Sequence, residues 1–176
     1  LLSLYFLALK LAQGRGRLNN AAIAELDLLP NAIAATTGLA TPLKVWAQKL
    51  SLLNNVFFVG RNIHYPVALE AAQKLKEVGY IHAEGYPSGE IKHGPVTLIN
   101  RSTPVIACLP WDLMADKTLA NLHDVKTKQG EIYLLSDAGL SSSEHFHCIQ
   151  MPKKLDHLNP ILYSVAFQIL SYYTAL

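Results

Sequence analysis

Short runs rich in β-branched and aromatic residues alternate along this chain with stretches of helical length. The β-rich runs cover residues 56–59, 80–83, 104–109, 132–135 and 148–151. Helical patterns lie between them at residues 66–78 and 112–128, and Gly79 and Gly130 act as their stop signals. Strands that alternate with helices form open parallel sheets covered on both faces. The sequence therefore predicts a doubly wound α/β domain with a parallel sheet of about five strands.

The first third of the chain has a different pattern. Helices are expected at residues 1–11, 19–35 and 41–53, with Pro30 and Pro42 near their boundaries. A last helix is expected to begin at Pro160, capped by Asn159. These patterns divide the chain into a helical segment, residues 1–53, and an α/β domain, residues 54–176.

Composition excludes several classes of protein. The chain is 51% hydrophobic and 16% charged, which is incompatible with disorder. A net charge of +2 gives no reason to expect a nucleic acid or an anionic membrane as partner. The uncharged residues 160–176 are at the short end for a membrane span, so a buried or interface helix is expected there. The two cysteines, Cys108 and Cys148, are too few for a disulfide framework and fit a reducing, cytoplasmic location.

The helix expected at residues 66–78 has two faces. One is apolar, and the other carries Glu70, Lys74 and Glu77 at positions i, i+4 and i+7. Such a row is ordinarily a solvated face with two weak ion pairs. The same row could also provide a carboxylate general base whose ionisation is tuned by a lysine one turn away. The residues alone favour the solvated face.

Residues 82–95 form the segment of the chain that is richest in titratable groups. They contain two histidines, two glutamates, a lysine and three glycines. In a doubly wound fold, residues 84–93 of this segment should lie near the carboxyl ends of the strands, where such folds bind ligands, together with residues 60–62 and Asp137. A polar surface loop and a ligand-binding loop are equally compatible with this composition.

Three further groups are weaker candidates. His145 and His147 suit one face of a strand and Glu144 is adjacent, but no third metal ligand is identifiable. Residues 141–143 are three serines without the glycine spacing of a phosphate loop, which indicates a flexible loop. Cys108 lies in an apolar strand and is expected to be a buried, inert thiol.

Several motifs, taken in order, resemble the C-terminal isomerase domain of the glutamine–fructose-6-phosphate aminotransferases, also called glucosamine-6-phosphate synthases. The resemblance covers nearly the whole chain and is strongest from residue 56 to residue 106. Its motifs are Val59-Gly60-Arg61, Tyr65-Pro66-Val67-Ala68-Leu69-Glu70, Leu75-Lys76-Glu77, Tyr80-Ile81-His82-Ala83-Glu84 and Gly89-Glu90-Ile91-Lys92-His93-Gly94-Pro95.

The resemblance implies a sugar isomerase (SIS) domain that acts on fructose 6-phosphate and yields glucosamine 6-phosphate, without cofactor or metal. It assigns Glu77 as the base that moves a proton between C1 and C2, with Lys74 as its neighbour. It assigns His93 to ring opening in the active site of the partner subunit, which implies a homodimer. These implied roles overturn the solvated-face interpretation of the helix.

In this family the chain also has a glutaminase domain and a first SIS half, which holds the main sugar-phosphate loop. A tail after the final helix carries a lysine that forms a Schiff base with the sugar. None of these is found in residues 1–176, apart from a helix at residues 1–11 that resembles the end of the first half. We therefore expect residues 1–176 alone to be inactive. A different SIS isomerase or deglycase, or a sugar-phosphate-sensing module without catalysis, are the alternatives.

Overall fold

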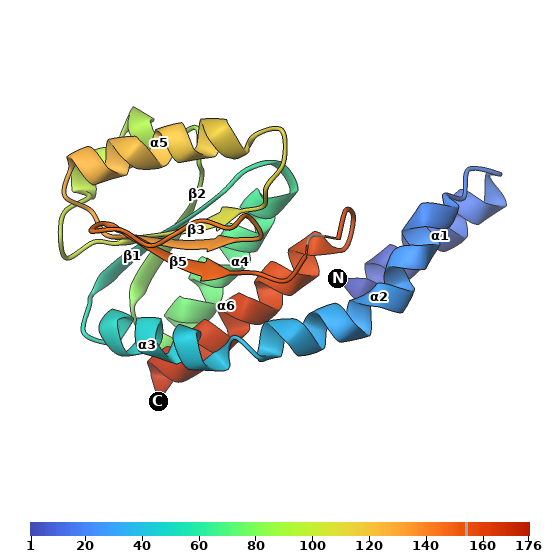
Figure 1. The fold of residues 1–176 in the computed structure, drawn as a ribbon, viewed down its shortest axis with the longest axis horizontal. Helices are drawn as coiled ribbons and strands as arrows, with labels where there is room; N and C mark the ends of the chain where they lie inside the picture. The colour runs from blue at the N-terminus through green and yellow to red at the C-terminus, as the bar shows by residue number, and fades with distance from the viewer. Residues whose placement is uncertain (154) are drawn as a thin grey trace.

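The computed structural model describes residues 1–153 and 155–176, and its centre is a five-stranded parallel sheet in the order β2-β1-β3-β4-β5 (Figure 1). This confirms the predicted fold class. All four strand pairs are parallel, and Asn55 of β1 lies opposite His82 of β2. The strands are β1 (Asn55–Gly60), β2 (His82–Pro87), β3 (Val105–Leu109), β4 (Ile132–Ser136) and β5 (Phe146–Gln150).

Within residues 1–153 and 155–176, six α-helices and three short 3₁₀ helices accompany the sheet. The α-helices are α1 (Leu2–Gly14), α2 (Asn20–Thr37), α3 (Ala40–Leu50), α4 (Tyr65–Gly79), α5 (Ala115–Thr127) and α6 (Asn159–Ala175). The 3₁₀ helices are η1 (Asn62–His64), η2 (Ile91–His93) and η3 (Pro95–Leu98). Among the described residues, no helix is long and apolar enough to cross a membrane.

The sheet separates two hydrophobic clusters. Helices α3, α4 and α6 cover one face, where Phe58 of β1 packs edge-on against Phe167 of α6 (Figure 1). Helix α5 and the 3₁₀ segment after β2 cover the other face, where Ile91 packs with Phe57 and Val105. Alternate residues of each strand enter opposite clusters, as the two-residue period of a strand requires.

Helix α1 and the first part of α2 extend away from this body (Figure 1). Helix α1 buries none of its residues, although Tyr5 donates a hydrogen bond of 2.9 Å to the Ala22 carbonyl of α2. Pro30 was expected near a helix boundary but lies inside α2. Burial of Leu29 and packing of Ile33 against the first cluster keep the helix continuous at this point. Tertiary packing thus outweighs the hydrogen bond that proline removes.

Two other local expectations were wrong. Tyr80 was expected to begin a strand, but with a φ of 54° it ends α4 in a left-handed conformation, and β2 starts only at His82. Asn159 was expected to cap α6, but it is the first residue of that helix. The backbone N–H groups of residues 156–158 instead donate to the Glu25 carboxylate of α2, at distances of 2.9–3.3 Å. A side chain 131 residues away in sequence thus satisfies donors that precede the helix.

The turn after β1 requires glycine at one position. A β-carbon at Gly60 would lie 2.1 Å from the carbonyl oxygen of His64, which no side chain could tolerate. Asn62 takes the left-handed conformation in the next turn, with a φ of 52°. Asparagine tolerates this conformation better than most residues do, so a second glycine is not needed here.

Candidate functional site

The polar face of α4 brings together two of the three residues assigned by the resemblance. The Lys74 ammonium lies 2.8 Å from the Glu77 carboxylate and 3.9 Å from the carboxylate of Glu70. The three side chains are 37–52% exposed, so solvent and other molecules can reach them. Residues three and four positions apart on a helix meet on one face, which explains the row.

A fourth side chain completes this group. The Gln73 amide donates a hydrogen bond of 3.0 Å to the second carboxylate oxygen of Glu77. The hydrogen bond from Lys74, followed by that from Gln73, holds the pKa of Glu77 below its usual value. The same contact with Glu77 raises the pKa of Lys74. The geometry thus favours an ionised carboxylate that is open to solvent and held at both oxygens.

The apolar side of α4 fixes the position of this group. Val67, Ala71 and Leu75 are buried against the sheet and α6. Gly85 of β2 permits a close approach, because a β-carbon there would lie 2.9 Å from the Leu69 Cα. Val78 was expected to join the apolar stripe but is 42% exposed, because it lies in the last turn of the helix.

His93 lies apart from this group. It ends η2, whose first residue Ile91 is buried in the second cluster, on the opposite face of the sheet from α4. Glu77 lies five residues before β2 begins, whereas His93 comes six residues after β2 ends. Because α4 and η2 cover opposite faces, the sheet lies between Glu77 and His93 within one chain.

Strand β2 carries a second set of linked polar side chains. The Tyr86 hydroxyl donates to the Glu84 carboxylate, which also lies 3.4 Å from His82 Nε2. The His82 ring in turn contacts the side chain of Asn55 at 3.0 Å. The bond to Glu84, with burial, raises the pKa of Tyr86 to about 12. Tyr86 packs against Phe57 of the second cluster, so these groups lie along the edge of the sheet on the face opposite α4.

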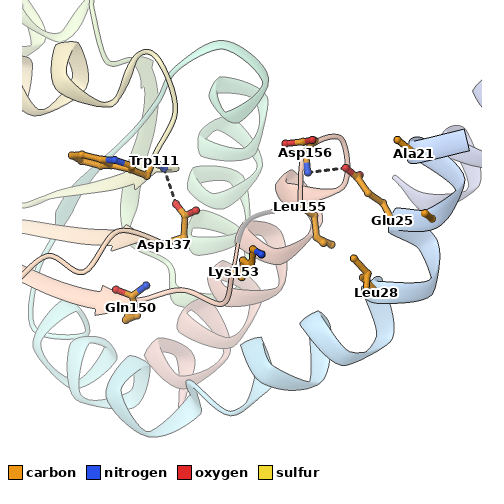
Figure 2. A pocket seen from close by; sticks show the side chains of 10 residues that line it. Ala21, Glu25, Leu28, Trp111, Asp137, Gln150, Lys153, Leu155 and Asp156 are labelled. Carbon is orange, nitrogen blue, oxygen red and sulfur yellow. Dashed lines mark hydrogen bonds between the residues drawn. The ribbon is translucent and has the colours of Figure 1, made fainter. Parts of the chain in front are cut away.

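The carboxyl edge of the sheet contains the groups expected there. Asp137 follows β4 and accepts a hydrogen bond of 2.7 Å from the Trp111 backbone, and Ser88 donates its N–H to the Gly60 carbonyl. A cavity of about 810 Å³ opens at this edge, between Asp137, Trp111 and α2 (Figure 2). Glu84 is an exception, because it lies inside β2 opposite Phe57 rather than beyond the strand.

A larger, more apolar cavity of about 1020 Å³ lies between α1, α4 and α6. Glu70 is one of its lining residues, together with Pro66 and Val67 of α4 and Ile161 of α6. Because Glu70 contacts Lys74, the polar row on α4 begins at the margin of this cavity.

The two histidines considered for a metal site have a different role. His145 Nδ1 lies 3.1 Å from one oxygen of Glu131, and His147 Nε2 lies 2.6 Å from the other. Across residues 1–153 and 155–176, no group of three or more His, Cys, Asp or Glu side chains is placed to hold a metal ion. The three residues therefore form an ion-paired cluster that links the starts of β4 and β5.

Cys108 is buried as expected, and this burial raises the pKa of its thiol. The serine segment is partly fixed, because Ser142 Oγ accepts a hydrogen bond of 2.9 Å from the Cys148 backbone. Sequence reasoning missed Gln73, Glu131 and Glu25. The four-residue spacing from Gln73 to Glu77 was a visible signal, whereas the other two act across contacts that no local pattern reveals.

The chain matches the SIS domain model over residues 49–176. Curated relatives named glutamine–fructose-6-phosphate aminotransferase (isomerizing) include one from Bordetella pertussis, 42% identical over 99% of this chain, and one from Neisseria meningitidis, 38% identical over the whole chain. This chain spans 30% of the length of each.

Among solved structures, the chain is similar to the C-terminal domain of glucosamine–fructose-6-phosphate aminotransferase from Francisella tularensis. The two are 33% identical with a TM-score of 0.85, over 95% of this chain and 49% of that one. The parallel sheet, the helices on both faces and the matched residues all agree with one family. The chain belongs to the SIS domain family.

Proposed function

We propose that this chain supplies the isomerisation step of a glutamine–fructose-6-phosphate aminotransferase, in which Glu77 is the base. The observation that carries the proposal is the exposed Glu77 carboxylate, held 2.8 Å from the Lys74 ammonium on a helix whose other face is buried. The B. pertussis and N. meningitidis relatives, which carry this name, support the choice of reaction.

The chemistry requires a base that is charged at neutral pH and can reach a carbon-bound proton. Glu77 removes a proton from C1 of the sugar, the electron pair of that C–H bond forms a double bond between C1 and C2, and the electron pair of the C2=O or C2=N double bond moves onto the oxygen or nitrogen, which takes up a proton. The carboxylic acid then returns its proton to C2, while the C1 hydroxyl loses its proton and C1=O forms. The hydrogen bonds from Lys74 and Gln73 lower the pKa of Glu77, which keeps the carboxylate ionised before the transfer.

In this proposal, His93 acts in the active site of a second copy of the chain and assists ring opening. The placement of Glu77 and His93 on elements that cover opposite faces of the sheet supports this arrangement, because the sheet separates the two side chains within a single chain. Two copies related by a two-fold axis would place each His93 near the partner's Glu77 region. The chain is thus proposed to act as a homodimer in the cytoplasm.

The remaining segments of such an aminotransferase are proposed to supply the rest of the site. This chain spans 30% of the length of its relatives. Sugar-phosphate binding, the Schiff-base lysine and ammonia release are assigned to those other segments. Residues 1–176 alone are therefore expected to give no turnover, because catalysis requires these groups to be held together.

A hybrid enzyme tests the proposal. The matching segment of the B. pertussis relative is replaced by this chain, and glucosamine 6-phosphate formation is measured for the unmodified hybrid and for Glu77→Gln. Glu77→Gln should lose turnover and retain binding of fructose 6-phosphate, whereas Glu144→Gln, an exposed loop change, should keep both turnover and binding. A folded hybrid without turnover, or a Glu77→Gln hybrid that keeps it, would contradict the proposal.

A further inference from the structure

Gln73 is not among the residues that the resemblance assigns, yet it contacts the proposed base directly. Its side-chain amide donates a 3.0 Å hydrogen bond to one oxygen of Glu77, while Lys74 donates to the other oxygen at 2.8 Å. We propose that Gln73 is a positioning residue, which fixes the orientation of the Glu77 carboxylate and helps to keep it ionised. This inference rests on the proposed role of Glu77.

The two donors together restrict the carboxylate in a way that one donor does not. Lys74 lies between two carboxylates, since Glu70 is 3.9 Å away on its other side. A lysine ammonium is a compact charge on a flexible stem, so Lys74 alone allows the Glu77 carboxylate to rotate. The bond from Gln73, one turn before Glu77 on the same helix, fixes the second oxygen.

The remaining lone pairs stay available for chemistry. A carboxylate offers about four acceptor positions on its two oxygens, and Gln73 and Lys74 occupy two of them. Glu77 remains 45% exposed, so a carbon-bound proton can approach the positions that are left. Gln73 and Lys74 therefore orient the Glu77 carboxylate without blocking access to it.

The chemical type of Gln73 also suits a base. A neutral amide stabilises the ionised carboxylate less than a second cation would, and it therefore removes less basicity. The pKa of Glu77 lies below its usual value, with Lys74 as the first cause and Gln73 as the second. A leucine at position 73 should raise that pKa, and a lysine there should lower it further.

The surroundings of Glu77 contain few other charges. On α4 itself these are Lys74, Glu70 and the exposed Lys76, which precedes Glu77 in sequence, and His64 of η1 lies at the other, N-terminal end of the helix. Helix α6 and strand β1, which pack against α4, have no Asp, Glu, Lys, Arg or His. On β2, His82 and Glu84 are engaged with Asn55 and Tyr86. A change in the titration of Glu77 can thus be assigned to residue 73.

The first experiment follows the Glu77 carboxyl carbon by NMR during a pH titration of this chain. Gln73→Leu should move its midpoint to higher pH and Gln73→Lys to lower pH. Gln48→Leu, an equivalent change at an exposed position of α3, should leave it unchanged. Identical midpoints for the wild type and both Gln73 variants would overturn the inference.

The second experiment measures kcat/KM against pH for the same variants in the hybrid enzyme. Gln73→Leu should move the acid limb to higher pH and lower the rate by up to about twofold on that limb, below the usual pKa of 4.5, in line with the strength of an exposed pair on a helix. The rate at pH 8 should change little. A uniform loss at all pH values, or an acid limb that does not follow the NMR midpoint, would overturn the positioning role.

The two proposals fail in different ways. If Glu77→Gln retains turnover, Glu77 is not the base and the proposed function fails together with this inference. If Glu77→Gln abolishes turnover while Gln73→Leu leaves the acid limb in place, the proposed function stands and only the positioning role of Gln73 is lost.

Discussion

Two carboxylates of this chain are each held by two donors, but in different surroundings. Glu77 is bound by Gln73 and Lys74 on the outer face of a helix, and its side chain is 45% exposed. Glu131 is bound by His145 and His147 at the ends of two neighbouring strands, and its side chain is 28% exposed. Both have a pKa below the usual value.

The difference lies in what the donors are attached to. The partners of Glu77 come from its own helix and leave it open to solvent, so removing the carboxylate should disturb chemistry more than folding. The partners of Glu131 come from 14 and 16 residues away and join β4 to β5, so removing it should disturb folding. Similar hydrogen bonding is thus proposed to serve a catalytic site at Glu77, whereas at Glu131 it joins two neighbouring strands.

The largest expected effect is a difference in kcat between the variants of the two carboxylates. In the hybrid enzyme, Glu77→Gln should lower kcat by about 10²–10⁴-fold, the usual contribution of a positioned acid–base group. Glu131→Gln should change kcat less than about threefold. Steady-state rates at saturating fructose 6-phosphate test this comparison. An equal loss of kcat in Glu77→Gln and Glu131→Gln would show that the two carboxylates do not differ in their importance for catalysis.

The next effect concerns the cation beside Glu77. Lys74→Met removes the first cause of the low pKa of Glu77, so the acid limb of kcat/KM should move to higher pH. The loss should reach about fivefold on the acid limb, below the usual pKa of 4.5, at the upper end for an exposed ion pair, and should be small at pH 6 and above. Lys126→Met, in the last turn of α5, is the matched control and should leave the limb in place. A downward movement of the limb in Lys74→Met would contradict the assignment.

Much of the fold was predictable because each strand and helix has a local signature. The run from Val56 to Val59 and the helix that follows it were placed from pattern alone. The errors occurred where distant contacts decide: Pro30 inside α2 is tolerated because Leu29 is buried, and Glu25 satisfies donors 131 residues away. No local pattern contains such information.

The candidate site was predictable only in part. The spacing of Lys74 and Glu77 predicts their contact on one helix face, and the structure shows it. The position of His93 depends on how the segment after β2 folds over the second cluster, which no periodicity specifies. The sequence did not reveal that His145 and His147 share Glu131 as a partner, because Glu131 contacts them only once β4 and β5 pair.

A smaller effect should appear in the stability of the chain. Glu131→Gln weakens the contacts with His145 and His147 and should lower the free energy of unfolding by about 1 kcal/mol, a charged hydrogen bond discounted for partial exposure. Urea unfolding of the 176-residue chain near neutral pH measures this difference. Glu144→Gln, beside the same strand but exposed, should differ from wild type by less than about 0.5 kcal/mol.

The smallest expected effect is the pH dependence of the difference in unfolding free energy between wild type and Glu131→Gln. Partial burial raises the pKa of Glu131, but the hydrogen bonds from His147 and His145 outweigh it, so the folded pKa lies below the usual 4.5. The stabilisation is therefore fully present above about pH 4.5 and is lost as the pH falls through the folded pKa. The gap between wild type and Glu131→Gln should narrow by a few tenths of a kcal/mol between about pH 5 and pH 3. A gap that stays constant or widens over this interval would show that the two histidines do not stabilise the charged form of Glu131, and the contrast with Glu77 would then rest on geometry alone.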